Sequence, residues 1–203
     1  MFKTTRIHLI RHCEVVDHDQ PRYNGQTDVA VTERGLEQYH RIKERLAACS
    51  ISACFSSDLS RCAIGADIIC ERLDIKPRLL KELRELNIGV WEGLSWDEIK
   101  ERWPTEWQAR LDDMVNYRVP GGENLLDMEA RVIPMLKDIV NRHEGDELLI
   151  VAHGGVNRII LLNAIGAPLC SVFNIEQNFC CHNIIDYYSD GLATVKLLNG
   201  QLS

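Results

Sequence analysis

The sequence has little positive charge and no long apolar run, and each of these absences excludes a class of function. Its 203 residues carry 23 Lys and Arg against 30 Asp and Glu, which gives a formal net charge of −7. Nucleic acids and anionic membranes attract positively charged surfaces, so neither is expected as a partner. No apolar stretch approaches the ~20 residues of a membrane helix. Arg6, His8 and Arg11 interrupt the N-terminal region where a secretory signal would be apolar.

The eight cysteines lack the spacing of a metal site or a disulfide framework. None forms a C-x-x-C pair, and the one close pair is the adjacent Cys180-Cys181. We therefore predict no metal, no cofactor and a reducing, cytoplasmic setting. A cysteine phosphatase needs arginine six residues after its cysteine, but Asp19 follows Cys13 at that distance. We interpret Cys13 as a small packing residue, with sensitivity to oxidation as the minor alternative.

The pattern of apolar residues predicts strands that alternate with helices over a single domain, residues 1–203. Strands are predicted at 6–10, 51–57, 147–153, 182–189 and 193–199. Helices are predicted at 33–49, 60–73, 124–143 and 156–165, with one or two more over 95–116. The predicted apolar faces of the first two helices comprise Leu36, Tyr39 or His40, Lys43 and Leu46, then Ile64, Ile68, Ile69 and Leu73. This order is typical of an α/β fold with three layers, α/β/α, and a mostly parallel sheet.

Polar clusters follow three of the predicted strands. Arg11-His12 ends the first, residues 56–61 end the second with Arg61, and His153-Gly154-Gly155 end the third. Ligands of such folds bind beyond the carboxyl ends of the strands, so these clusters are expected to converge. Guanidinium groups match phosphate oxygens, helix N-termini add N–H donors, and glycines let the backbone approach an anion. The sequence therefore predicts a phosphate site built without a metal ion.

A reaction at such a site needs a nucleophile and an acid. A neutral histidine can attack phosphorus near neutral pH. The acid is expected within residues 82–85, as Glu82 or Glu85. Any one of these residues alone is most simply a structural or solvated side chain, and their joint occurrence at three strand ends is what favours catalysis.

Four segments resemble the motifs of the histidine phosphatase superfamily, which has the phosphoglycerate mutase-like fold. They are LIRHCE, SSDLSRC, LRELNIGVWEG and VAHGGVNR, in the order of the family and over nearly the whole chain. The resemblance implies that His12 becomes phosphohistidine while Arg11, Arg61 and His153 hold phosphoryl oxygens. It also implies that Glu85 is the general acid. Asn24, Gly25 and Gly154 are expected close to the substrate.

Three positions depart from the family pattern without removing a catalytic group. Cys13 stands in place of the usual glycine beside the nucleophile, and it is expected to narrow the phosphate pocket or to shift the loop. Asp58 stands where proline is common, and Gly65 stands where threonine is common.

Within the family, the chain resembles α-ribazole-5′-phosphate phosphatases, which act in cobalamin assembly. The matching segments are RYNGQTDVAVTERG, VPGGENLLDMEARV and CCHNIIDYY. Alternatives are a broad-specificity acid-type phosphatase, a phosphoglycerate mutase-like transferase, and a non-catalytic or phosphoprotein-directed module. The absence of an Arg-Arg pair disfavours a mutase, and the complete catalytic set disfavours an inactive module. A small-molecule phosphate ester is the expected ligand, and a homodimer is one option for the assembly.

All four tryptophans lie within residues 91–107. This segment belongs to a helical insert, about 91–120, that is expected to lie over the active site. Trp91 and Trp103 are interpreted as packing residues. For Trp96 and Trp107 two interpretations stay open, packing within the insert or an aromatic wall for a flat leaving group.

Overall fold

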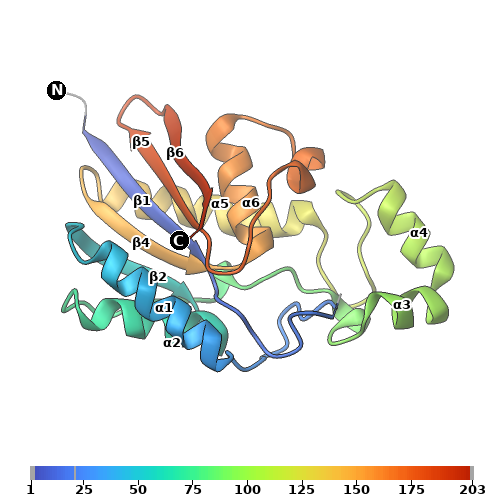
Figure 1. Cartoon of the computed structure of the whole chain (residues 1–203). Helices are drawn as coiled ribbons and strands as arrows, with labels where there is room; N and C mark the ends of the chain where they lie inside the picture. The colour runs from blue at the N-terminus through green and yellow to red at the C-terminus, as the bar shows by residue number, and fades with distance from the viewer. Residues whose placement is uncertain (1–2, 21, 202–203) are drawn as a thin grey trace.

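A six-stranded sheet lies between two pairs of helices, and a separate helical lobe projects beyond its edge (Figure 1). The computed structural model describes residues 3–20 and 22–201. The strands are β1 (Thr4–Arg11), β2 (Ile51–Ser57), β3 (Arg78–Leu80), β4 (Glu147–Ala152), β5 (His182–Tyr188) and β6 (Ala193–Gly200). The longer helices are α1 (Glu33–Leu46), α2 (Ser60–Glu71), α3 (Trp96–Arg102), α4 (Pro104–Asp112), α5 (Leu125–Arg142) and α6 (Gly154–Ile165).

The sheet has the order β3-β2-β4-β1-β5-β6. Its first four strands are parallel, and β5 and β6 join as antiparallel neighbours. The strands β2, β4 and β1 are therefore adjacent, and their carboxyl ends open at one edge of the sheet. This arrangement confirms the predicted α/β fold with a mostly parallel sheet.

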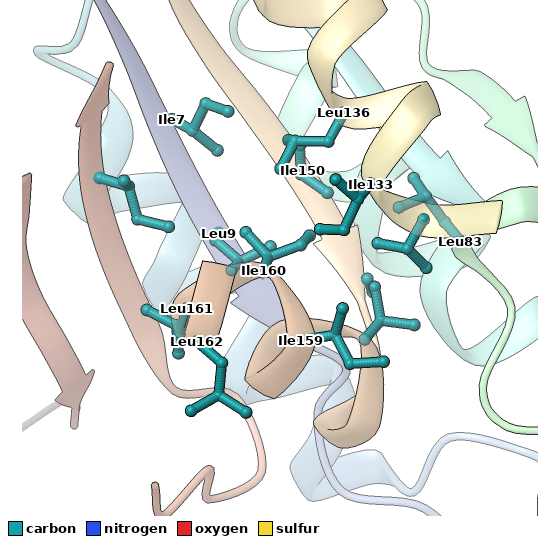
Figure 2. Packing of buried hydrophobic residues seen from close by; sticks show 14 of the residues in the cluster. Ile7, Leu9, Leu83, Ile133, Leu136, Ile150, Ile159, Ile160, Leu161 and Leu162 are labelled. Carbon is teal, nitrogen blue, oxygen red and sulfur yellow. The ribbon is translucent and has the colours of Figure 1, made fainter. Parts of the chain in front are cut away.

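Apolar residues on both faces of the central strands explain the two helical layers. Ile7 and Leu9 of β1 point toward α5 and α6, where they pack with Ile150 of β4 (Figure 2). The alternate residues Ile10 and Leu149 pack toward α1 and α2. Strands that are buried on both faces read as continuous apolar runs, which is why the sequence located them well.

The helices begin where the sequence indicates, but the predicted buried faces of α1 and α2 were partly wrong. Thr32 caps α1 by accepting a hydrogen bond from the N–H of Gly35. The buried side of α1 is formed by Gly35, Tyr39, Ile42 and Leu46. On α2, Ile64 is exposed, and the small residues Cys62, Gly65 and Ala66 face the core instead. The two helices pack closely, so small residues of α2 face α1. A search for large apolar residues at helical spacing does not find such a face.

Residues 91–120 form a lobe with its own small core. Ile88, Trp91, Ile99 and Val119 are buried there, with Tyr23 and Trp107 packed against them. Ser95 caps α3 with a capping box, and Pro104 is the first residue of α4, where its missing N–H costs no helical hydrogen bond. Among the described residues, no helix has the length and apolarity required to cross a membrane.

A disulfide joins Cys13 to Cys180, whose Cα atoms lie 4.1 Å apart. Cys13 is fully buried in the core, as expected of a packing residue, but its bond to Cys180 was not predicted. The two cysteines are 167 residues apart, and cysteine spacing alone does not reveal such a pairing. The bond is an oxidised state that does not fit the expected reducing setting, and the cellular compartment stays a prediction.

We expect removal of this disulfide to lower stability. Without reductant, the double variant Cys13→Ala/Cys180→Ala should lose about 2–4 kcal/mol of unfolding free energy, because the bond closes a long loop in the unfolded chain. Denaturant titration measures the loss, and wild type in excess reductant should match the variant. Cys170→Ala is the control, since Cys170 is exposed and free. Equal stability of wild type and the double variant without reductant would contradict the prediction.

Candidate active site

The three polar clusters predicted from the sequence meet at the carboxyl ends of β1, β2 and β4. Arg11, His12 and Arg61 form the floor of a cavity of about 380 Å³, and Gly155 of the third cluster lines it as well. The ring centroids of His12 and His153 are 5.2 Å apart. The parallel pairing of β1 and β2 with β4 produces this convergence of residues that are far apart in sequence.

His12 is held as a neutral imidazole whose Nε2 has no hydrogen-bond partner among the described residues. Its Nδ1 lies 2.9 Å from the carbonyl oxygen of Cys13, so Nδ1–H donates and Nε2 retains its lone pair. Burial, and then the charges of Arg11 and Arg61, hold the pKa of His12 well below its ordinary value. An unprotonated Nε2 between two guanidinium groups is arranged for attack on an electron-poor phosphorus.

Arg61 is fixed by contacts on both edges of its guanidinium group. Its two Nη atoms donate to the carbonyl oxygens of Thr27 and Gly25, at 2.8 and 2.6 Å. Its Nε–H donates to Nδ1 of His153 at 3.3 Å. Each Nη atom retains a second hydrogen, so the group can still donate to an anion in the cavity.

His153 is fully buried behind the cavity and does not line it. Because Nδ1 accepts from Arg61, the proton lies on Nε2 and is donated to Oγ of Ser57 at 2.9 Å. Burial, and then the charges of Arg61 and its neighbours, keep its pKa well below the ordinary value. In this conformation His153 positions Arg61, and its direct contact with a phosphoryl oxygen stays a prediction.

Glu85 lines the cavity, whereas Glu82 is exposed and does not. The Glu85 carboxylate accepts hydrogen bonds from the N–H groups of Leu86 and Gly155, at 2.8 and 3.0 Å. A Cβ atom at position 155 would displace this carboxylate, so the glycine allows Glu85 to lie against the start of α6. The N-terminus of α6, which was expected to bind phosphate, thus binds the carboxylate of Glu85, the candidate acid. Gly155 reaches the cavity wall, and Gly154 does not.

Glu92 organises the loop that holds Arg61, a role that the sequence reasoning missed. Its carboxylate accepts from the backbone N–H groups of Gln26 and Thr27, both at 2.9 Å, and from Thr27 Oγ1 at 2.8 Å. The backbone oxygens of Gly25 and Thr27 are thereby aimed at Arg61. The family-like segment VWEG contained Glu92 and was the available signal.

Two departures from the family pattern have a structural explanation. The ring of Tyr39 fills the space that a side chain at position 65 would need, so glycine stands there. The Tyr39 hydroxyl in turn donates to the carbonyl of Arg61 and accepts from the N–H of Cys13 at 3.1 Å. Asp58 forms a two-pronged ion pair with Arg84, beside Glu85, with both N–O distances 2.6 Å. Tyr39 thus connects Arg61 to the residue after His12, and Asp58 connects the end of β2 to the residue before Glu85.

The rest of the cavity wall is apolar and aromatic, with further arginines. Tyr23, Asn24, Gly25 and Trp96 come from the loop and lobe that cover it. Trp107 packs between Trp91 and Trp96 within the lobe and does not line the cavity, which decides its interpretation in favour of packing. The sequence analysis did not single out several lining residues, among them Arg110, Val172, Phe173 and Phe179, and it included Arg22 and Arg158 only within quoted motifs.

Phe179 covers the floor of the cavity. Its ring lies 4.0 Å from the Cζ atom of Arg11 and 5.4 Å from the ring of His12. Arg11 also donates to the carbonyl of Gln177. The segment before β5 therefore fixes the first guanidinium of the site, and Cys180 anchors this segment through its disulfide with Cys13.

A group of metal-binding side chains lies outside this cavity. His8, Cys49 and Glu147 place one ligand atom each within 4.8 Å of one another. His8 lies within β1, four residues before His12 in the sequence. Its Nε2 lies 2.7 Å from a carboxylate oxygen of Glu147. Among the charged residues that line the cavity, five arginines outnumber the two carboxylates Asp17 and Glu85, a donor set suited to an anion rather than to a metal ion.

Comparison with known proteins points to one family. The sequence pattern of the histidine phosphatase superfamily (branch 1) matches residues 7–200. Probable phosphoglycerate mutase GpmB of Erwinia tasmaniensis is 29% identical over 182 residues, which cover 90% of this chain and 85% of the relative. The YhfR structure from Bacillus stearothermophilus has a TM-score of 0.88 and 28% identity over 98% of both chains. The alpha-ribazole phosphatase from Shigella flexneri has a TM-score of 0.89 and 24% identity, covering 98% of this chain and 99% of that chain.

Proposed function

The chain belongs to the histidine phosphatase superfamily, branch 1, and on this premise we propose that it hydrolyses a small phosphate monoester through a phosphohistidine at His12. The observation that best supports this proposal is the neutral His12 imidazole. Its Nε2 has no hydrogen-bond partner among the described residues, and two fixed arginines line the same cavity. The family membership makes the chain a histidine phosphatase superfamily enzyme. The residue roles and the substrate are our proposals.

In the proposed reaction, Nε2 of His12 attacks phosphorus and the bond to the ester oxygen breaks. The protonated carboxyl of Glu85 gives its proton to the departing oxygen. A water molecule then loses a proton to the Glu85 carboxylate and attacks phosphorus, which breaks the N–P bond and frees His12. Arg11 and Arg61 offset the charge that spreads over the phosphoryl oxygens, so the scheme uses no metal or cofactor.

Two kinds of leaving group are candidates. An aromatic one, as in α-ribazole 5′-phosphate, is supported by the rings of Trp96, Phe173 and Phe179 on the cavity wall. An anionic one, as in phosphoglycerates, is supported by the arginines of the same wall and by the mutase names of the sequence relatives. A role in cobalamin assembly follows from the first candidate and not from the second.

Rates on matched esters test the proposal. We expect phosphate release from p-nitrophenyl phosphate, and a kcat/KM at least about tenfold higher on the natural class of ester, because binding energy from the leaving group is used in the transition state. Assays with α-ribazole 5′-phosphate and 3-phosphoglycerate identify the class. Isomerisation of 3-phosphoglycerate without phosphate release would contradict the hydrolase proposal and indicate a mutase.

A further inference from the structure

Three side chains that can bind a metal ion meet on one face of the sheet, away from the catalytic cavity. His8 lies in β1, two residues before Ile10. Glu147 begins β4, two residues before Leu149. Side chains alternate between the faces of a strand, so His8 and Glu147 lie on the face that α1 and α2 cover. Cys49 reaches them from the connection between α1 and β2.

This group is a centre of its own. None of its three residues lines the catalytic cavity, and four residues of extended chain, about 13 Å, separate His8 from His12. His8 and Glu147 are 139 residues apart in the sequence. The expectation of no metal was based on the spacing of cysteines, which contains no signal of ligands that come from such distant segments.

The ligand atoms lie near the spacing that a zinc ion requires. Tetrahedral Zn²⁺ binds nitrogen, oxygen and sulfur at about 2.0–2.3 Å, which holds its ligand atoms roughly 3.3–3.8 Å apart. Nε2 of His8 lies 2.7 Å from Oε1 of Glu147, and the sulfur of Cys49 lies within 4.8 Å of a ligand atom of each. Side-chain shifts of about 1 Å would therefore bring all three atoms to the distances of a zinc site.

His8 is oriented as metal-binding histidines are. Its Nδ1 lies 2.9 Å from Nε2 of His182, and the two rings are stacked with their centroids 5.1 Å apart. A histidine ligand commonly uses its second nitrogen to fix the ring. When Nδ1–H donates to His182, the lone pair of Nε2 points toward Glu147. Nδ1 of His182 is buried without a partner among the described residues, so the histidine pair does not form a complete structural network by itself.

The contacts of the carboxylate leave one oxygen directed at His8. The backbone N–H of Ser50 donates to Oε2 of Glu147 at 2.8 Å, while Oε1 faces the imidazole. Arg6 is the neighbour of Glu147 across the β1–β4 pairing, but it forms a two-pronged ion pair with Asp186 at 2.7 and 2.8 Å. The nearby positive charge is thus compensated. A carboxylate and a thiolate together supply the two negative charges that balance a dication.

We propose that His8, Cys49 and Glu147 bind a Zn²⁺ ion, with water as the fourth ligand. Zn²⁺ accepts this mixture of imidazole, thiolate and carboxylate, and the thiol loses its proton to solvent when it binds. The side chain of Glu147 is 21% exposed and Cys49 is half-buried, so the ion and a water molecule can reach the group. The ion links β1, β4 and the connection before β2. It takes no part in the proposed hydrolysis, and the inference does not depend on that function.

Binding of zinc alone tests the site. The full chain, freed of metal with a chelator, should bind one Zn²⁺ with a Kd of about 1 µM or less, since structural sites with four protein ligands bind more tightly still. Competition with a chromogenic zinc indicator measures the affinity. Co²⁺ in place of Zn²⁺ should give a thiolate-to-cobalt charge-transfer band in the near ultraviolet, which reports the sulfur ligand.

Substitutions locate the ion. Cys49→Ala should abolish the cobalt band and weaken zinc binding by at least about tenfold, because even changes to groups that only support a ligand cost 10- to 100-fold. Cys170→Ala is the matched control, since Cys170 is exposed and free, and it should keep both the band and the affinity. Glu147→Gln retains an oxygen for the N–H of Ser50 but loses the charge, so it should weaken zinc binding and keep the thiolate band.

Three results would overturn the site. The first is a chain that binds no zinc, and the second is a cobalt complex without the thiolate band. The third is zinc binding that survives in Cys49→Ala but is lost in His12→Ala, which would place the ion in the catalytic cavity. Hydrolysis of p-nitrophenyl phosphate is a separate measurement, so loss of the zinc site leaves the proposed function standing, and the reverse also holds.

Discussion

Replacement of His12 by alanine is expected to lower kcat/KM for phosphate monoesters by about 10⁴-fold or more, because the attacking nitrogen is lost while the arginine clamp remains. Hydrolysis of p-nitrophenyl phosphate measures the loss. In wild type, rapid quenching should trap a phosphoryl group that is lost in acid and kept in base, as expected of phosphohistidine, and the variant should show none.

His40→Ala is the matched control, since His40 is an exposed histidine of α1 outside the cavity. It should keep wild-type rates and labelling. A His12→Ala enzyme that retained more than about one hundredth of wild-type activity would indicate a different nucleophile, because removal of an essential nucleophile costs far more than that.

The direction of the His12 pKa shift adds a pH criterion to the same prediction. A pKa well below the ordinary value means that the proton binds only at lower pH, so the nucleophile stays neutral as pH falls from 7 through 6. In the free enzyme, the His12 ring followed by NMR should therefore show no titration midpoint near pH 6.5. A midpoint there would mean that His12 titrates as an ordinary, solvated histidine.

Glu85→Gln should reduce hydrolysis of alkyl phosphates by about 10²- to 10⁴-fold, because the leaving alkoxide then receives no proton. Glutamine retains a carbonyl oxygen that can accept from the N–H of Gly155, so the loop geometry is preserved. p-Nitrophenolate departs without help, so p-nitrophenyl phosphate should lose much less in the first step. The ratio of the two losses is the measurement.

Glu82→Gln provides the comparison, because Glu82 lies in the same short segment but is exposed and outside the cavity. It should leave both rates unchanged. Equal losses on the alkyl and nitrophenyl esters in Glu85→Gln would assign Glu85 a positional role, and the source of the proton would have to be sought elsewhere.

The floor of the site could be predicted from sequence because its parts follow buried strands. Arg11 ends β1, His12 follows it, and Arg61 lies in the first turn of α2 just after β2, and parallel strands bring such residues to one edge of a sheet. Glu85 was found through a family-like motif. The elements themselves were predictable for the same reason, since continuous apolar runs of strand length identified β1, β2 and β4.

The roof of the site could not be predicted, because it depends on contacts without a local signal. Arg110 looks like any surface charge of an amphipathic helix until the packing of the lobe buries it. Phe179 and Cys180 reach the site through a segment between two regular elements. Residue type does not distinguish Trp96 from Trp107. In the folded lobe Trp96 is exposed, whereas Trp107 lies against both Trp91 and Trp96.

The disulfide also changes how the molecule would respond to mechanical load. If the two ends of the oxidised chain were pulled apart, the force would pass from residue 13 to residue 180 through sulfur, and residues 14–179 would carry none of it. Only the segments outside the bond would extend, by roughly 100 Å at ~3.3–3.6 Å per residue. The pairings of β1 with β4 and β5, and of β5 with β6, would yield, so Arg11 and His12 would leave the phosphate site although the residues between the two cysteines carry no load. Reduction of one bond would convert this shielded molecule into one whose whole chain can be drawn out.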